Sequence, residues 1–139
     1  MMSRSIRLGT VGAALLSAMH WQPSMAAEVT PLCKGSPLVV AACFTVHGRL
    51  SLANGAFTVR IWPVGTHRML GVADGDGKMH WEDGPVLPKA VIRILASRPR
   101  GEVGVFGNYE LCRLTREEPG HMQSVCVENA SQLVGGAVH

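Results

Sequence analysis

The stretch from residue 43 to residue 62 constrains the fold most, because apolar and polar side chains alternate along CFTVHGRLSLANGAFTVRIW. Successive side chains of a strand point to opposite faces of a sheet, so the alternation predicts two half-buried strands. Asn54 and Gly55 lie between them and tolerate positive φ, which predicts a two-residue hairpin turn. Leu50 is then expected opposite Val59.

This register gives the hairpin one apolar face and one polar face. On the apolar face, the expected pairs are Leu52 with Phe57, Leu50 with Val59, and Gly48 with Ile61. On the polar face, they are Ser51 with Thr58, Arg49 with Arg60, and His47 with Trp62. A slip by one residue would move apolar side chains onto the polar face, so the register is strongly specified.

The rest of the chain reads as further short strands separated by turn residues. The expected strands are HRMLGVA (67–73), KMHWE (78–82), AVIRILAS (90–97), EVGVFGNYELC (102–112) and MQSVCVENA (122–130). The DGDG run at 74–77 and the Pro119-Gly120 pair supply the chemistry of tight turns. The chain has 16 glycines and 8 prolines and lacks sustained helical periodicity. It is therefore predicted to be all-β, a small antiparallel sandwich or barrel without a helix longer than a turn or two.

The first 26 residues have the order of a secretory signal peptide. Arg4 and Arg7 precede an apolar run from Leu8 to Met19, and small residues follow as far as Ala26. The run of about 12 residues is shorter than the roughly 20 that a membrane-spanning helix needs, so we expect no retained transmembrane helix. Cleavage is expected after Ala26, with Ala27 as the alternative last residue of the signal.

Cleavage there leaves about 113 residues, the size of a single domain. This β-rich domain is expected to span 27–139, with a loose glycine-rich tail after Val134. The signal carries two of the 13 basic residues and none of the 10 acidic ones, so the net charge falls to about +1. Proteins that bind nucleic acid concentrate positive charge, so nucleic acid is not an expected partner.

Four cysteines lie in the exported part of the chain: Cys33, Cys43, Cys112 and Cys126. An even number in an exported chain predicts two disulfides. The sequence has no C-x-x-C spacing, which argues against thiol-redox catalysis and a zinc ribbon. Cys112 and Cys126 flank Pro119 about symmetrically, so pairing of the two last strands would bring them together. We therefore expect a Cys112–Cys126 bridge and, by elimination, a Cys33–Cys43 bridge.

Two blocks of the sequence resemble a family of small exported bacterial proteins of unassigned function. The blocks are CFTVHGRLSLANGAFTVRIWPVGTHRMLGV and VFGNYELCRLTREEPGHMQSVCVENA, and the shared segments are VHGRL, RIWPVGT and a late VFG…C…PGxMQxVC pattern. The resemblance implies a periplasmic or secreted location and brings no activity with it. A weaker likeness of GRLSLANG…VRIW…LGVADGDGKM to transthyretin-like proteins supports a β-sandwich by analogy.

The polar face of the hairpin is the first candidate binding site. Arg49 opposite Arg60 places like charges together, which destabilises a strand pair unless something compensates. Two guanidinium groups could bind an anionic ligand through a carboxylate or phosphate, with Trp62 as a stacking surface and His47 beside them. In the structural alternative, a neighbouring strand or the Glu82-Asp83 pair supplies the counter-charge.

Histidine and methionine form the second candidate site. Each methionine of the exported part lies within two residues of a histidine: His67 with Met69, Met79 with His80, and His121 with Met122. Thioether and imidazole groups suit Cu(I) in an exported protein. The spacings match no named metal motif, and among several histidines some adjacency arises by chance. A copper carrier is therefore one hypothesis beside a protein that holds no cofactor.

The carboxylates give little indication of catalysis. Asp74, Asp76 and Glu82 follow one another as in a calcium loop, but Lys78 stands where an oxygen ligand is needed, so a β-turn is the better interpretation. The adjacent pairs Glu82-Asp83 and Glu117-Glu118 would point to opposite faces of a strand, whereas acid–base catalysis needs converging groups. The sequence favours a non-catalytic binding or envelope-structural protein, whose expected partner is an envelope protein or an anionic ligand.

Overall fold

The computed structural model describes residues 31–53, 58–78, 84–97 and 103–137. The elements in chain order are β1 (Phe44–Leu52), β2 (Val59–Pro63), β3 (Leu70–Val72), α1 (Lys89–Ala96), β4 (Val103–Arg113) and β5 (Gln123–Ala137). The predicted signal peptide and nearly all of the predicted strand at 78–82 lie outside the described residues. No helix in the described part of the chain has the length and apolar character needed to span a membrane.

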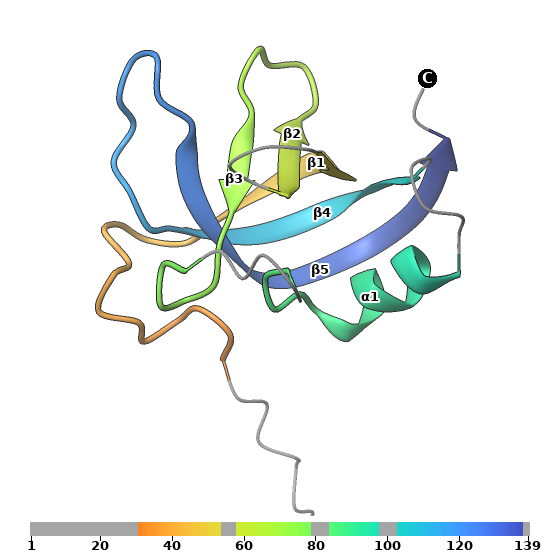
Figure 1. Cartoon of the computed structure of the whole chain (residues 1–139), viewed down its shortest axis with the longest axis horizontal. Coiled ribbons are helices and arrows are strands. Elements are labelled where there is room, and N and C mark those ends of the chain that lie inside the picture. The colour runs from red at the N-terminus through yellow and green to blue at the C-terminus, as the bar shows by residue number, and fades with distance from the viewer. Residues whose placement is uncertain (1–30, 54–57, 79–83, 98–102, 138–139) are drawn as a thin grey trace, which may run out of the picture.

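The five strands close into one barrel in the order β1-β2-β3-β5-β4, with β4 pairing back onto β1 (Figure 1). Neighbouring strands run antiparallel, apart from the parallel pair of β3 and β5. The predicted all-β class with two disulfides is confirmed. Of the two predicted architectures, sandwich and barrel, the structure is a barrel. OB-folds are also five-stranded barrels, but a shared architecture carries no function by itself.

β1 and β2 form the predicted hairpin in a different register. Leu50 lies opposite Ile61, so each β1 residue pairs two positions further along β2 than the sequence predicts. The amide of Ala53 donates to the carbonyl oxygen of Thr58 (2.8 Å), which leaves residues 54–57 as the connection. The predicted two-residue turn is therefore wrong, because Ala53 still precedes the connection but pairs with Thr58 instead of Ala56, so the connection is two residues longer on the β2 side.

The shift is even, so the alternation keeps side chains on their predicted faces. Leu50, Val59 and Ile61 are all buried, as predicted. Leu52 is the exception, because it lies at the end of β1 and is 53% exposed. The predicted partner of Leu52, Phe57, lies outside the described residues.

Residues 90–97, predicted as a buried strand, form most of helix α1 instead. Val91, Ile94 and Leu95 recur at the spacing of one helix face, and this face packs against the barrel core. Pro88 precedes the helix, and its carbonyl oxygen accepts the first helical hydrogen bond from Val91 (2.9 Å). Burial of one apolar face against the barrel therefore outweighs the β-branched composition on which the strand prediction rested.

The C-terminal tail, predicted to be loose after Val134, belongs to β5 as far as Ala137. Gly135 and Ala137 pair with Val105 and Val103 of β4. Backbone pairing needs no side chain, so a glycine-rich segment can extend a strand when a partner strand lies beside it. The prediction of a loose tail is wrong for these residues.

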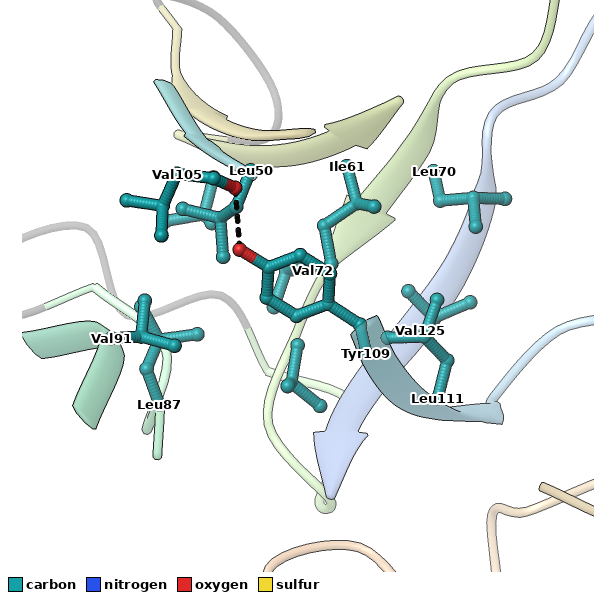
Figure 2. Packing of buried hydrophobic residues seen from close by; sticks show 12 residues of the cluster. Leu50, Ile61, Leu70, Val72, Leu87, Val91, Val105, Tyr109, Leu111 and Val125 are labelled. Atoms are coloured by element: carbon teal, nitrogen blue, oxygen red, sulfur yellow. Dashed lines mark hydrogen bonds between the residues drawn. The ribbon is translucent and has the colours of Figure 1, made fainter. Parts of the chain in front are cut away.

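One apolar cluster fills the barrel (Figure 2). Its buried members come from the five strands, from α1 and from the residues just before α1: Leu50, Val59, Ile61, Leu70, Val72, Leu87, Val91, Val105, Tyr109, Leu111, Val125 and Val127. The hydroxyl of Tyr109 donates to the carbonyl oxygen of Val105 (2.6 Å). Burial raises the pKa of Tyr109, because a phenolate would lose its hydration here.

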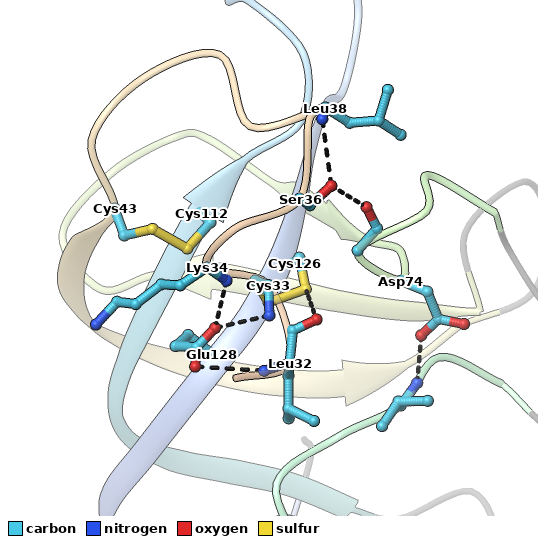
Figure 3. Close-up of a disulfide and its surroundings, with 12 residues drawn as sticks. Leu32, Cys33, Lys34, Ser36, Leu38, Cys43, Asp74, Cys112, Cys126 and Glu128 are labelled. Carbon is cyan, nitrogen blue, oxygen red and sulfur yellow. Dashed lines mark hydrogen bonds between the residues drawn. A yellow bond between two sulfur atoms is a disulfide. The ribbon is translucent and has the colours of Figure 1, made fainter. Parts of the chain in front are cut away.

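Two disulfides join the cysteines as Cys33–Cys126 and Cys43–Cys112 (Figure 3), so the predicted pairing is wrong. Cys112 does lie opposite Cys126 in the β4–β5 ladder, as the sequence predicts. However, β4 also pairs with β1, and Cys43 stands on that side, one step beyond the pair of Phe44 with Leu111. That contact joins segments 69 residues apart, which local spacing does not reveal.

The segment 31–42 lies against the outside of β4 and β5 and is held there by Glu128 (Figure 3). One carboxylate oxygen of Glu128 accepts from the amides of Cys33 (2.7 Å) and Lys34 (2.8 Å), and the other accepts from the amide of Leu32 (3.3 Å). Beneath the segment lies a second small apolar cluster, formed by Cys33, Ala73, Cys112, Leu114 and Cys126. A charged acceptor and a disulfide thus fasten the same few residues.

Tyr109 gives a direct test of the barrel core, because it is the only tyrosine of the chain. Its raised pKa means that the folded protein keeps the phenol protonated where the unfolded chain ionises it, above about pH 10. Ionisation of this residue should not affect stability below that pH, and stability should fall as the pH rises beyond it. Alkaline titration followed by phenolate absorbance and circular dichroism should show ionisation only as the fold is lost. Phenolate formation near pH 10 in a protein that stays folded would contradict the packing.

The role of Glu128 can be tested by Glu128→Gln, which keeps the shape and removes the charge of the acceptor. We expect a loss of about 2 kcal/mol in the free energy of unfolding, measured by urea denaturation, because hydrogen bonds to charged groups are the strong ones. The matched control is Glu110→Gln. Glu110 pairs with Lys34 at the surface (2.6 Å), where their hydrogen bond raises the pKa of Lys34, and exposed pairs contribute little. Equal losses in the two variants would refute the assignment.

Candidate functional site

Two loops at one end of the barrel form a pocket of about 360 Å³, which we call the rim pocket. One loop connects β2 to β3 and the other connects β4 to β5, and they stand next to each other in Figure 1. The pocket is lined by two of the predicted His/Met pairs, namely His67 and Met69 from the first loop and His121 and Met122 from the second. The structure thus brings together two pairs that the sequence indicates separately.

A hydrogen-bond network fixes the base of the rim pocket. Gln123 is only 5% exposed; its Oε1 accepts from Arg68 (2.8 Å), and its Nε2 donates to the carbonyl oxygen of Thr115 (2.9 Å). Arg68 also forms an ion pair with Glu117 (3.2 Å). One buried amide therefore joins the two loops that carry the His/Met pairs.

Two imidazoles and two thioethers line the rim pocket, a set that suits a soft ion such as Cu(I) or Ag(I), and the carboxylates of Glu117 and Glu118 line it as well. Within the described residues, a single set of three His, Cys, Asp or Glu ligand atoms lies within 4.8 Å of one another, namely Cys33, Cys112 and Glu128. Its sulfurs are already in disulfides, so they are not metal ligands. At the rim pocket, a metal site therefore depends on the methionines. The third predicted pair, Met79 with His80, lies outside the described residues.

The four predicted anion-site residues lie on the outer face of β1 and β2, but not in the predicted pairs. Arg49 lies opposite Trp62, with its Cζ 5.5 Å from the ring centroid, while Arg60 lies opposite Ser51. The predicted opposition of Arg49 and Arg60 is therefore wrong. Because the register moves by two residues, a like-charge pair is replaced by a favourable cation–π contact. His47 remains on this face, beyond the end of the β1–β2 ladder.

Sequence reasoning missed the side chains that β4 adds to this outer face. The β1–β4 ladder places Asn108 opposite His47 and Phe106 opposite Arg49. His47 Nδ1 and Asn108 Oδ1 lie 3.0 Å apart. Alternation along β4 puts Phe106 and Asn108 on one face, but nothing in the sequence indicates that β1 is the neighbouring strand.

Asp74 and Asp76 hold loops together. Asp74 is buried, and its carboxylate accepts from the amide of Val86 (2.5 Å). Asp76 accepts from the amide of Lys78 (2.9 Å) within a turn, in agreement with the β-turn interpretation. Glu82 and Asp83, proposed as a counter-charge for the arginines, lie outside the described residues.

Comparisons of the chain with protein-family models, with curated proteins and with solved structures give no match. The resemblance carried by the VHGRL, RIWPVGT and VFG…C…PGxMQxVC segments therefore stays a prediction. The function has to be inferred from the rim pocket and the outer face of the barrel themselves.

Proposed function

We propose that the protein is an exported, non-catalytic carrier of a soft metal ion, Cu(I), which it binds at the rim pocket. The observation that carries the proposal is that His67 and Met69 of one loop line the same pocket as His121 and Met122 of another. Either pair alone offers two donors, whereas the shared pocket offers four.

The chemistry of the donors favours a soft ion. Cu(I) prefers sulfur and imidazole ligands, while carboxylates suit harder ions. All four cysteines of the chain are in disulfides, so methionine is the sulfur donor that remains. A thioether forms no disulfide, which makes it compatible with an oxidising compartment.

Export to the periplasm or beyond is part of the same proposal. Two disulfides support it, because such bonds persist in oxidising compartments. The basic, apolar and small-residue order of residues 1–26 supports it as well.

Binding without catalysis is favoured by the surroundings of the rim pocket. Glu117 is paired with Arg68, and Arg68 is in turn bonded to Gln123, so these groups serve to hold the loops. His67 and His121 are exposed on loops. Acid–base chemistry instead needs a proton donor or acceptor held against a substrate in a defined cleft.

Titration of the purified exported protein with Ag(I) tests the proposal, since Ag(I) resembles Cu(I) and needs no reductant that could attack the disulfides. We expect binding of micromolar affinity or better. Met69→Leu combined with Met122→Leu should weaken it about tenfold or more, because leucine fills the volume but lacks the sulfur. Competition for Cu(I) against a chromophoric chelator in ascorbate then gives the affinity for copper.

Two control variants locate the site. His47→Gln removes an imidazole that does not line the rim pocket and should leave the titration unchanged. Met79→Leu combined with His80→Gln should also leave it unchanged, and loss of binding in that variant alone would move the site away from the rim pocket. A wild-type protein that binds no Ag(I) at micromolar concentration would refute the proposal.

A further inference from the structure

Four residues from four neighbouring strands form a line across the outer wall of the barrel, which we call the aromatic line. Trp62 of β2 lies opposite Arg49 of β1, Arg49 opposite Phe106 of β4, and Phe106 opposite Val134 of β5. Side chains directly opposite on one face of a sheet have Cβ atoms about 5 Å apart. Val134 is 64% exposed and the other three are half-buried. The line therefore offers an apolar surface with a cation in it.

Arg49 has no counter-charge within this line. None of the ion pairs between described residues includes Arg49, and its buried Nε has no hydrogen-bond partner among them. The contact with the ring of Trp62 fixes the guanidinium in place. Arg49 is half-buried and has no anionic partner among the described residues, so its guanidinium is the group on this face that can take an anionic ligand.

A chain of hydrogen-bonded polar side chains runs beside the aromatic line. His47 contacts Asn108 (3.0 Å), and Asn108 Nδ2 donates to Gln132 Oε1 (2.8 Å). Gln132 has a φ of 51° at an irregularity of the β4–β5 ladder, a conformation that non-glycine residues rarely adopt. Backbone strain of this kind persists where the surroundings impose it, and it is frequent at binding sites.

A shallow depression of about 130 Å³ continues from this polar chain. Its lining offers hydroxyl, amide and carboxylate groups, from Thr45, Asn108, Glu110, Asn129 and Ser131. The hydroxyls and amides donate and accept hydrogen bonds and the carboxylate accepts them, which suits a ligand rich in hydroxyl groups.

We infer that this outer wall binds a carboxylated oligosaccharide. The apolar face of a sugar ring packs on the aromatic line, its carboxylate meets Arg49, and its hydroxyls bond to the polar chain and the depression. Nucleic acid also needs stacking and a cation, but it is held by many positive charges, whereas Glu110 borders this site and the exported chain is nearly neutral. The aromatic line shares no residue with the rim pocket, so the inference does not rest on metal binding.

Calorimetric titration of the purified exported protein with an oligogalacturonate tests the inference. The wild type should bind it, and Arg49→Gln, which keeps the length of the side chain but removes the charge, should weaken binding about tenfold or more. A neutral maltooligosaccharide of the same length should bind more weakly and should be insensitive to Arg49→Gln. The matched control is Arg93→Gln on the exposed surface of α1, which should leave the affinity unchanged.

A second variant keeps the test valid if Arg49→Gln fails to fold. Asn108→Ala interrupts the polar chain without touching the cation, and it should weaken binding of the acidic and the neutral sugar alike. Absence of oligogalacturonate binding by the wild type, equal affinity for the neutral sugar, or an equal loss in Arg93→Gln would overturn the inference. Tighter binding of an oligodeoxythymidylate would also overturn it and assign the wall to nucleic acid. The double variant Met69→Leu with Met122→Leu should bind the sugar like the wild type. Sugar binding and metal binding can therefore succeed or fail independently of each other.

Discussion

The pairing of β1 with β4 is the contact on which the rest of the structure depends. The hairpins β1–β2 and β4–β5 are joined on one side through β3, which pairs with β2 and β5, and the ladder from Phe44 to Ser51 on β1 joins them on the other side and closes the barrel. Closure buries Leu50 against Tyr109 in a common core. On the outside, the same ladder sets Arg49 beside Phe106, so a single register determines both the core and the outer wall.

Three parts of the chain that are not strands pack on or connect the barrel: helix α1, the segment 31–42 and the loops of the rim pocket. Helix α1 packs against β4 and β5 and adds Val91 to the core. The segment 31–42 covers the outer surface of the same two strands, where Glu128 and the Cys33–Cys126 disulfide hold it. The loops of the rim pocket are joined through the buried Gln123. Apolar packing thus fixes the helix, a disulfide fixes the segment 31–42, and a buried amide fixes the loops. The His and Met side chains of the rim pocket therefore lie on loops that Gln123 holds together.

Local patterns in the sequence predicted local structure well. Alternation identified β1, β2 and the inward set of Leu50, Val59 and Ile61, because side-chain direction in a strand depends only on the period of two. The register between β1 and β2 was wrong, because it depends on the length of the connection. The helix was missed because its apolar face is stabilised by packing against the barrel, which no local pattern shows.

The β1–β4 ladder could not be predicted from local patterns. The disulfide pairing and the positions of Phe106 and Asn108 beside Arg49 depend on this ladder, so they could not be predicted either. The meeting of two His/Met pairs at the rim likewise depends on strand order, which no local pattern encodes.

The position of Cys112 has a consequence for how the chain acquires its bridges. It lies between Cys43, the residue just before β1, and Cys126 on β5, and its sulfur lies within 4.8 Å of that of Cys33. A chain whose β4–β5 hairpin is oxidised before β1 arrives would link Cys112 to Cys126 and leave the segment 31–42 without its anchor on β5. Attack of the Cys43 thiolate on the sulfur of Cys112 exchanges that bridge for the native Cys43–Cys112 bridge and releases the Cys126 thiolate, which a later oxidation then joins to Cys33. The order in which strand docking and oxidation occur therefore decides how much disulfide isomerisation the new chain must undergo.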